Sequence, residues 1–410
     1  MSVIQENITN LILERIRAVR TARRTGESTS TSEGRADIAK SVSAREAQFS
    51  DFEKVRDLNL RLGQGPDSVE NWRRLWLENP ALADGNGSSP IGWVLETSQG
   101  IVGFLGSIPL LYDFEGSGLR AAATCRFAVE PAYRAFSRLL VVSFFRQKNV
   151  DLFLNTTATV AAGKIMMALK ASPLPQPDYG TVLFWVLDTR GFTKEVFRKL
   201  GMKTTLMAPA TAVASLVMKG DAAFRARGPK YKRSQLDTRE IALQDIGEDF
   251  PQLWADSAKE SKKLSARRTP EVMRWHFDPP GTRRIVKVFG TYKKKEMLGY
   301  IIVRHEQAGA EDLRRALVAD MLVRNHDPEI LEQLFAAAIA SAKNIGCHVL
   351  EVMGFPRGVR QALLQWKPYS RKYPACPFFF KARNRELQEK LMDDRAWYAC
   401  PFDGDATLWP

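Results

Sequence analysis

One segment of the chain, residues 119–155, constrains the fold more than any other. An apolar run over residues 121–129 is interrupted by a proline in the turn at 130–135, and apolar residues then recur at helical spacing over 139–145. A second apolar run covers residues 150–155. Where a strand ends at a proline and the chain continues as a helix, the free backbone N–H groups of the first helical turn point to one place. The helix dipole is positive at that end. The segment therefore predicts a strand, turn, helix, strand unit of an α/β fold, with an anion-binding turn.

The turn resembles the pyrophosphate-binding turn of the GNAT N-acetyltransferase superfamily. In that family a Val-x-Pro-x-Tyr-Arg start leads into an Arg/Gln-x-x-Gly-x-Gly/Ala loop, and the start is matched here by Val129, Pro131, Tyr133 and Arg134. The two small positions carry Ser137 and Leu139 instead of glycine, so a leucine side chain narrows the approach to the backbone. The resemblance implies acetyl-CoA or another acyl-CoA as co-substrate, bound by Val129, Tyr133, Arg134, Ala135, Phe136, Ser137 and Arg138 together with Asn155 and Thr156.

The order of predicted elements agrees with this resemblance. Two helices at 49–62 and 68–77 precede the strands. The second half of the chain repeats this order of helices and strands without a pyrophosphate-binding turn, because two carboxylates occupy its turn at 324–329 and repel a pyrophosphate. A length of 410 residues also suggests two domains. We expect an α/β fold with mixed sheets, built as two tandem GNAT-like domains. The expected divisions are 1–48 (amphipathic helix and linker), 49–215 (first domain), 236–383 (second domain) and 384–410 (tail).

Acyl transfer requires a base for the acceptor and an acid near the leaving thiolate. Nothing in the sequence indicates a covalent enzyme intermediate, so we expect direct attack in a ternary complex. The candidate residues are Asn155 at the end of the later strand, Tyr179 as an acid, and Asp320 and Glu351 as bases, with Asp403 and Asp405 in the terminal segment as further bases. Asn155, Thr156 and Thr157 are equally compatible with helix capping, and each carboxylate with an ordinary ion pair.

Charge and cysteine spacing limit the partners. The formal charge of +14 attracts anions of every kind, but the aromatic residues fall in apolar runs, and no RNA-binding or zinc-finger motif is present, so nucleic acid is an unlikely partner. The four cysteines are far apart and the four histidines form no ligand motif, which predicts neither a disulfide framework nor a metal site and favours a reduced, cytoplasmic setting. The basic helix within residues 1–24 could contact an anionic membrane, such as the inner membrane face, or a protein.

The terminal segment 397–405 combines aromatic and acidic residues. Such a combination can stack on sugar rings, and tandem GNAT-like chains with such tails resemble acyltransferases of bacterial surface polysaccharide synthesis. The alternative is a docking segment that covers an apolar groove. We therefore expect an acyltransferase that acts on an amine or hydroxyl of a small-molecule or saccharide acceptor. Two alternatives stay open: a catalytically inactive binding or regulatory protein of the same fold, and an aminoacyltransferase of the Fem type.

Overall fold

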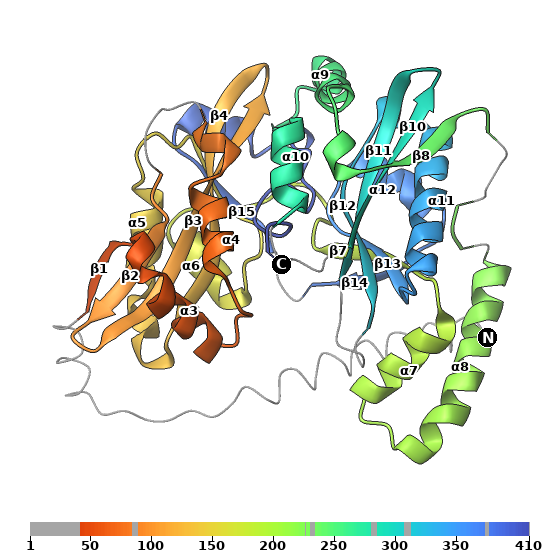
Figure 1. Cartoon of the computed structure of the whole chain (residues 1–410), viewed down its shortest axis with the longest axis horizontal. Coiled ribbons are helices and arrows are strands. Elements are labelled where there is room, and N and C mark those ends of the chain that lie inside the picture. The colour runs from red at the N-terminus through yellow and green to blue at the C-terminus, as the bar shows by residue number, and fades with distance from the viewer. Residues whose placement is uncertain are drawn as a thin grey trace.

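The computed structural model describes residues 42–83, 89–225, 227–229, 234–279, 285–306, 313–373 and 377–409. The amphipathic helix expected near the N-terminus lies outside these residues. Within them the elements form two mixed sheets, each covered by helices, which stand side by side in Figure 1. The α/β prediction is confirmed. No helix among these residues has the length and apolar character needed to cross a bilayer.

The first sheet is antiparallel except for one pair of adjacent strands, β4 and β5, which are parallel. In sheet order its strands are β1 (Ser43–Glu46), β2 (Gly92–Thr97), β3 (Gly100–Phe114), β4 (Ser117–Val129), β5 (Leu152–Asn155), β15 (Phe379–Ala382) and β6 (Ser172–Pro173), and β9 (Ser265–Ala266) pairs with β3. The helices of this half are α3 (Phe52–Arg61), α4 (Val69–Trp76), α5 (Ser137–Phe145) and α6 (Val160–Ala168).

Side-chain alternation along β2 separates the two faces of this sheet. Val94 packs in the core with Trp72 of α4, whereas Trp93 and Leu95 pack in a second cluster with Phe144 of α5. Successive residues of a strand point to opposite faces, so α3 and α4 cover one face and α5 the other. The helix starts follow from caps in the sequence: the Ser68 hydroxyl accepts a hydrogen bond from Asn71 N–H at the start of α4.

The second sheet has the same mixed pattern, with β12 and β13 as its parallel pair. In sheet order its strands are β14 (Tyr369–Lys372), β7 (Thr181–Val186), β13 (Val349–Val352), β12 (Arg315–Val323), β11 (Glu296–Glu306), β10 (Ile285–Lys293) and β8 (Asp237–Ile241). The helices of this half are α9 (Asp249–Ser261), α11 (Pro328–Asn344) and α12 (Arg357–Leu364), and the hairpin of α7 (Thr189–Lys199) and α8 (Thr204–Phe224) projects from it (Figure 1). Helix α10 (Pro270–Phe277) lies between the two halves, and α13 (Arg385–Lys390) packs on β15 of the first sheet.

The two halves of the chain exchange strands. β7, which precedes the predicted division near residue 215, pairs with β13 and β14 in the second sheet. Conversely, β15 lies near the end of the chain and pairs with β5 and β6 in the first sheet. At these two strands the sheets do not follow the order of the sequence, and each sheet depends on a strand from the other half.

Candidate functional site

A bulge in β4 separates this strand from β5 beside the predicted turn. Arg126 and Phe127 together oppose Leu105 of β3, and Arg126 has a φ of +49°, a left-handed conformation that is uncommon for a residue with a side chain. The parallel pairing with β5 ends at Ala123 opposite Leu154, while β4 continues to Val129. The strands therefore splay apart beyond this pair.

The second sheet repeats this arrangement. Ala319 is the extra residue of a bulge in β12, because Ile302 of β11 pairs with Asp320 and Val303 pairs with Val318. The parallel pairing of β12 with β13 ends at Val318, whereas β12 continues to residue 323. Both halves thus contain a parallel pair of strands that separates at a bulge. We call the place where β4 separates from β5 the first opening, and the place where β12 separates from β13 the second opening.

The C-terminal tail, residues 397–409, runs through both openings and lies between the two sheets (Figure 1). At the second sheet, Phe402 N–H donates to the carbonyl of Ala319 at 3.1 Å, and Phe355 N–H donates to that of Ala399 at 2.7 Å. At the first sheet, the Arg126 guanidinium stacks 4.1 Å from the ring centroid of Trp409. The tail therefore contacts both sheets and connects them.

Asp405 is the tail carboxylate that lies in the first opening. Thr156, just after β5, donates to Asp405 Oδ1 at 2.8 Å, and the Thr157 hydroxyl lies 3.1 Å from both carboxylate oxygens. Burial raises the pKa of the Asp405 carboxyl, and the hydroxyl hydrogen bonds offset part of that increase. Asp405 also contributes to the raised pKa of the buried Cys125 on β4, whose largest cause is burial. A buried carboxyl with a raised pKa between the two splayed strands can act as a base.

Gly404 allows the tail to approach β5 closely. A Cβ at this position would lie 2.2 Å from Thr156 Oγ1, and the φ of +147° is one that residues with side chains rarely adopt. Asn155 is also buried at this point, in register with Phe379 of β15. The structure therefore brings Thr156 and Thr157 together with Asp405, which the sequence offered only as a further base.

The predicted turn differs from the expected open cradle. Residues Pro131–Phe136 form a 3₁₀ helix that leads directly into α5. Tyr133 N–H donates to the carbonyl of Glu130, and Ser137 N–H to that of Arg134, so these two groups are used within the turn and are not free as the sequence suggested. The Ser137 hydroxyl donates to the same carbonyl of Arg134 at 2.6 Å.

The side chains of the turn divide into an inner and an outer set. Val129, Tyr133 and Phe136 pack against the cluster beneath α5, and Ser137 is buried. Arg134, Ala135 and Arg138 are exposed. Leu139, at the second expected small position, is also exposed. The turn thus presents two arginines and one leucine to solvent at the positive end of α5.

Asp320 lies in a buried ionic cluster instead of facing an opening. Arg268 donates from Nε to Asp320 Oδ2 at 3.0 Å and from Nη2 to Asp403 Oδ1 at 3.2 Å, and the Tyr300 hydroxyl donates to Asp320 Oδ2 at 2.5 Å. The side chains of Arg268 and Asp320 have no exposed area. Burial raises the pKa of Asp403, and the charge of Arg268 opposes this shift. The cluster joins the tail to β12, and its geometry favours a structural role.

Glu351 and Tyr179 lie apart from the opening. Glu351 on β13 is buried and accepts a hydrogen bond from Arg371 of β14 at 2.9 Å. The ring of Tyr179 stacks on Phe378 with centroids 5.3 Å apart. The four predicted catalytic residues Asn155, Tyr179, Asp320 and Glu351 therefore do not form one constellation. No cluster of potential metal ligands occurs among the residues that the structure describes.

The aromatic residues of the tail are buried, so the expectation that they stack on a sugar is wrong. Trp397, Tyr398 and Phe402 retain at most 4% of their accessible surface. The alternative interpretation, a segment that fills an apolar groove, is confirmed.

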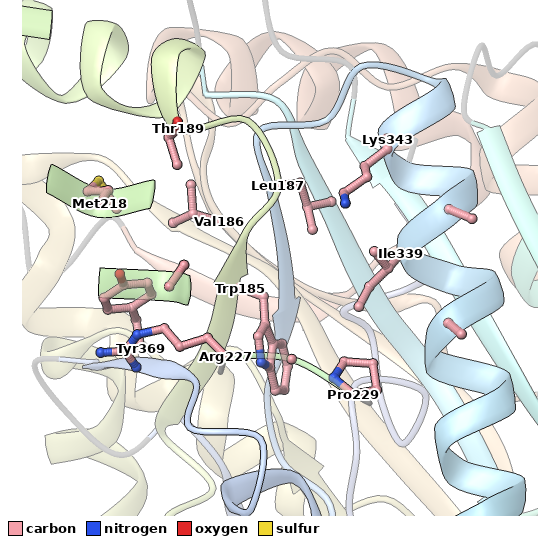
Figure 2. A pocket seen from close by; sticks show the side chains of 14 residues that line it. Trp185, Val186, Leu187, Thr189, Met218, Arg227, Pro229, Ile339, Lys343 and Tyr369 are labelled. Carbon is pink, nitrogen blue, oxygen red and sulfur yellow. The ribbon is translucent and has the colours of Figure 1, made fainter. Parts of the chain in front are cut away.

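A pocket of about 420 Å³ lies away from both openings, between β7, α8 and α11. Figure 2 shows that its wall includes Trp185, Met218, Ile339 and Lys343, and none of the predicted site residues lines it.

Solved structures of acyltransferases share this architecture. The chain aligns with a GCN5-related N-acetyltransferase from Anabaena variabilis ATCC 29413 at a TM-score of 0.53 and 10% identity, over 84% of this chain and 73% of that one. It also aligns with N-myristoyltransferase of Saccharomyces cerevisiae with bound myristoyl-CoA. The TM-score is 0.51 at 12% identity, over 87% of this chain and 80% of that one. The chain has the GNAT fold.

A third similar structure is an Enterococcus faecalis V583 protein described as a conserved protein of unknown function and probable N-acyltransferase. Its TM-score is 0.52 at 9% identity, over 83% of this chain and 72% of that one. No protein-family model matches the chain, and a search by sequence finds no match among curated proteins. At such low identity the likeness concerns the fold, so the function has to be argued from this chain's own residues.

Proposed function

We propose that this protein transfers an acyl group from an acyl-CoA to an amine or hydroxyl by direct attack in a ternary complex. The observation that carries the proposal is the opening between β4 and β5, which begins at the Arg126 bulge and contains the buried Asp405 carboxyl. The GNAT fold supports it, because neighbours with this fold include an enzyme that binds myristoyl-CoA. In this proposal the two halves are tandem GNAT-like units of which only the first binds acyl-CoA.

The residues of the first turn fit a pyrophosphate held by side chains. Arg134 and Arg138 are exposed at the positive end of α5, where an anion is favoured, and a guanidinium can bind phosphate oxygens through two N–H groups. The 3₁₀ hydrogen bonds and Leu139 limit the contribution of the backbone. Acyl-CoA would therefore depend more on these two arginines than on a glycine-rich loop.

Asp405 is the base in this mechanism. The acceptor nitrogen or oxygen attacks the thioester carbonyl carbon, the carbon–sulfur bond breaks, and the thiolate leaves with the bonding electrons. Asp405 takes the proton that the acceptor loses, for which its raised pKa is suitable. Asn155 and Thr156 orient the carboxylate and the thioester. Tyr179, the acid expected from the sequence, is stacked on Phe378 apart from this opening, so water is the proton donor to the thiolate. Asp320 and Glu351 serve in ion pairs.

A non-catalytic protein of the same fold is the second candidate, favoured by two features. The N–H groups of Tyr133 and Ser137 are already bonded within the turn, and the tail fills the opening where substrate would enter. Acyl-CoA turnover separates the two candidates. A saccharide precursor is one acceptor class to screen beside small amines, and dependence on charged tRNA would indicate the Fem type.

The site assignment is tested by charge reversal at the turn. In Arg134→Glu we expect acyl-CoA affinity to fall about ten-fold or more, because a charge-assisted hydrogen bond contributes about 1.5–3 kcal/mol and a repulsion replaces it. Arg146→Glu is the matched control: it reverses an exposed arginine just after α5, at the opposite end of the helix. Equal affinity in wild-type protein and Arg134→Glu would overturn the assignment of this turn.

A further inference from the structure

Helix α8 presents its more apolar face to solvent. Its large exposed apolar side chains are Leu206, Val213, Leu216, Val217 and Phe224, with exposed fractions between 46% and 91%. Leu206, Val213, Val217 and Phe224 recur at intervals of seven, four and seven residues, so they form one stripe along the helix. We call these five residues the α8 stripe. It extends for about 27 Å at 1.5 Å per residue.

The opposite face of α8, which packs on α7 and the sheet, is less apolar. It carries Thr211 and Ser215, both buried, and Met218, which lines the pocket of Figure 2, while Asp221 lies on the same edge of the helix as Lys203. The Ser215 hydroxyl lies 2.7 Å from that of Thr189 in α7, and Asp221 accepts a hydrogen bond from Arg227 at 2.8 Å. A helix that is stable by packing on its own protein normally shows the reverse arrangement. The α8 stripe therefore indicates a surface that something outside the described part of the chain covers.

The exposed charges of the α7–α8 hairpin are mostly positive. Exposed charged residues of the hairpin between 188 and 225 are one anion, Asp188, and five cations: Arg190, Lys194, Lys199, Lys203 and Lys219. At 100° per residue, Lys203 and Lys219 flank the two edges of the stripe. A helix with an aliphatic face bordered by lysines suits the boundary between headgroups and acyl chains of an anionic membrane.

Two other occupants fit less well. A second copy of the chain docked on the stripe would bring its Lys203 and Lys219 near those of the first copy, which is repulsive. A protein interface is typically rich in Tyr, Trp, Met and Arg at its centre, whereas the outer face of α8 offers Leu, Val and small residues, with one phenylalanine at its end. We propose that the α7–α8 hairpin binds the surface of an anionic lipid bilayer through the α8 stripe, independently of the acyl-transfer proposal.

The test is sedimentation of the full chain with vesicles of phosphatidylcholine and phosphatidylglycerol, compared with pure phosphatidylcholine, at low and moderate salt. We expect binding to the anionic vesicles that weakens as salt increases. In the double variant Val213→Asp, Leu216→Asp the partition coefficient should fall ten-fold or more. Both side chains are mostly exposed, so the fold should tolerate the change, and an unaltered thermal midpoint checks this.

Two controls keep the result specific. Leu60→Asp introduces one such charge at an exposed apolar helix position of the other half, and it should bind vesicles like wild type. Ile8→Asp, Leu11→Asp changes the basic N-terminal segment, so a loss there alone would assign the membrane contact to that segment and overturn the proposal. The proposal would also be overturned if the α8 variant bound vesicles as well as wild type, or if wild type did not bind anionic vesicles. A wild-type dimer that binds no vesicles and becomes a monomer on substitution of α8 would overturn it as well.

Discussion

Removing Arg268 should destabilise the protein more than any surface change of the same kind. In Arg268→Met two buried carboxylates, Asp320 and Asp403, lose the one guanidinium that pairs with both at 3.0 and 3.2 Å. The guanidinium also lies 4.0 Å from the ring centroid of Trp254, a contact that methionine replaces only in part. Breaking a buried pair by removing one partner costs about 3–5 kcal/mol, because an uncompensated charge remains in the interior.

The assay is urea unfolding at pH 7, followed by tryptophan fluorescence and by circular dichroism, with the free energy taken only if the two transitions coincide. Arg385→Met is the matched control, because Arg385 is 91% exposed and pairs with Glu389 on the surface, where such a pair contributes about 0.3–0.5 kcal/mol. A triple variant with Asp320→Asn and Asp403→Asn should recover part of the loss, since it removes the unpaired charges. A loss below about 1 kcal/mol in Arg268→Met would refute the claim that this cluster holds the tail against the second sheet.

Three further predictions concern the tail and His305. Asp405→Asn should lower acyl-transfer turnover while leaving acyl-CoA affinity nearly unchanged, and unchanged turnover would remove Asp405 from the mechanism. Gly404→Ala should lower the thermal midpoint, because the added methyl would lie 2.2 Å from Thr156 Oγ1; an unaltered midpoint would show that the tail can shift freely. Burial lowers the pKa of His305 to about 4, so the unfolded chain takes up a proton below about pH 6.5 that the folded chain does not. The stability contributed by neutral His305 is full above that pH and is lost as the pH falls toward about 4. The thermal midpoint of His305→Asn should therefore decrease less between pH 7 and 5 than that of wild type. An equal decrease in the two proteins would contradict this.

Local sequence patterns predicted most of the elements because their signals are local. The two tryptophans of α4, Trp72 and Trp76, are four residues apart and both are buried, and the serine before them caps the helix. Likewise, Pro328 begins α11 and Gly346, with a φ of +79°, follows its end. These positions report helix period and termini directly.

The strand exchange could not be predicted in the same way. β7 and β15 are short apolar strands, and such a run has no feature that selects a partner strand in one sheet over the other. Arg268 illustrates the same difficulty: it ends a basic run that suggests a solvated surface, but its partners lie 52 and 135 residues further along the chain.

The site was predictable only in part. The resemblance pointed to the turn after β4, but nothing in the sequence marked Arg126 as a bulge residue, since it is not a glycine. The aromatic and acidic composition of the tail was equally compatible with a sugar-binding surface and a buried segment. Burial of Phe402 and the hydrogen bonds from Thr156 and Thr157 to Asp405 decide for the buried segment, and these depend on contacts between distant parts of the chain.

The most direct test of the proposed function is titration calorimetry of the full chain with acetyl-CoA at low and at moderate salt. A protein of charge +14 attracts any anion weakly, and moderate salt screens that attraction while affecting a defined site much less. The proposal predicts saturable binding of one acetyl-CoA per chain that persists at moderate salt and weakens in Arg134→Glu. No measurable binding, or binding that disappears with salt, would contradict it and would favour a protein that retains the GNAT fold without its co-substrate.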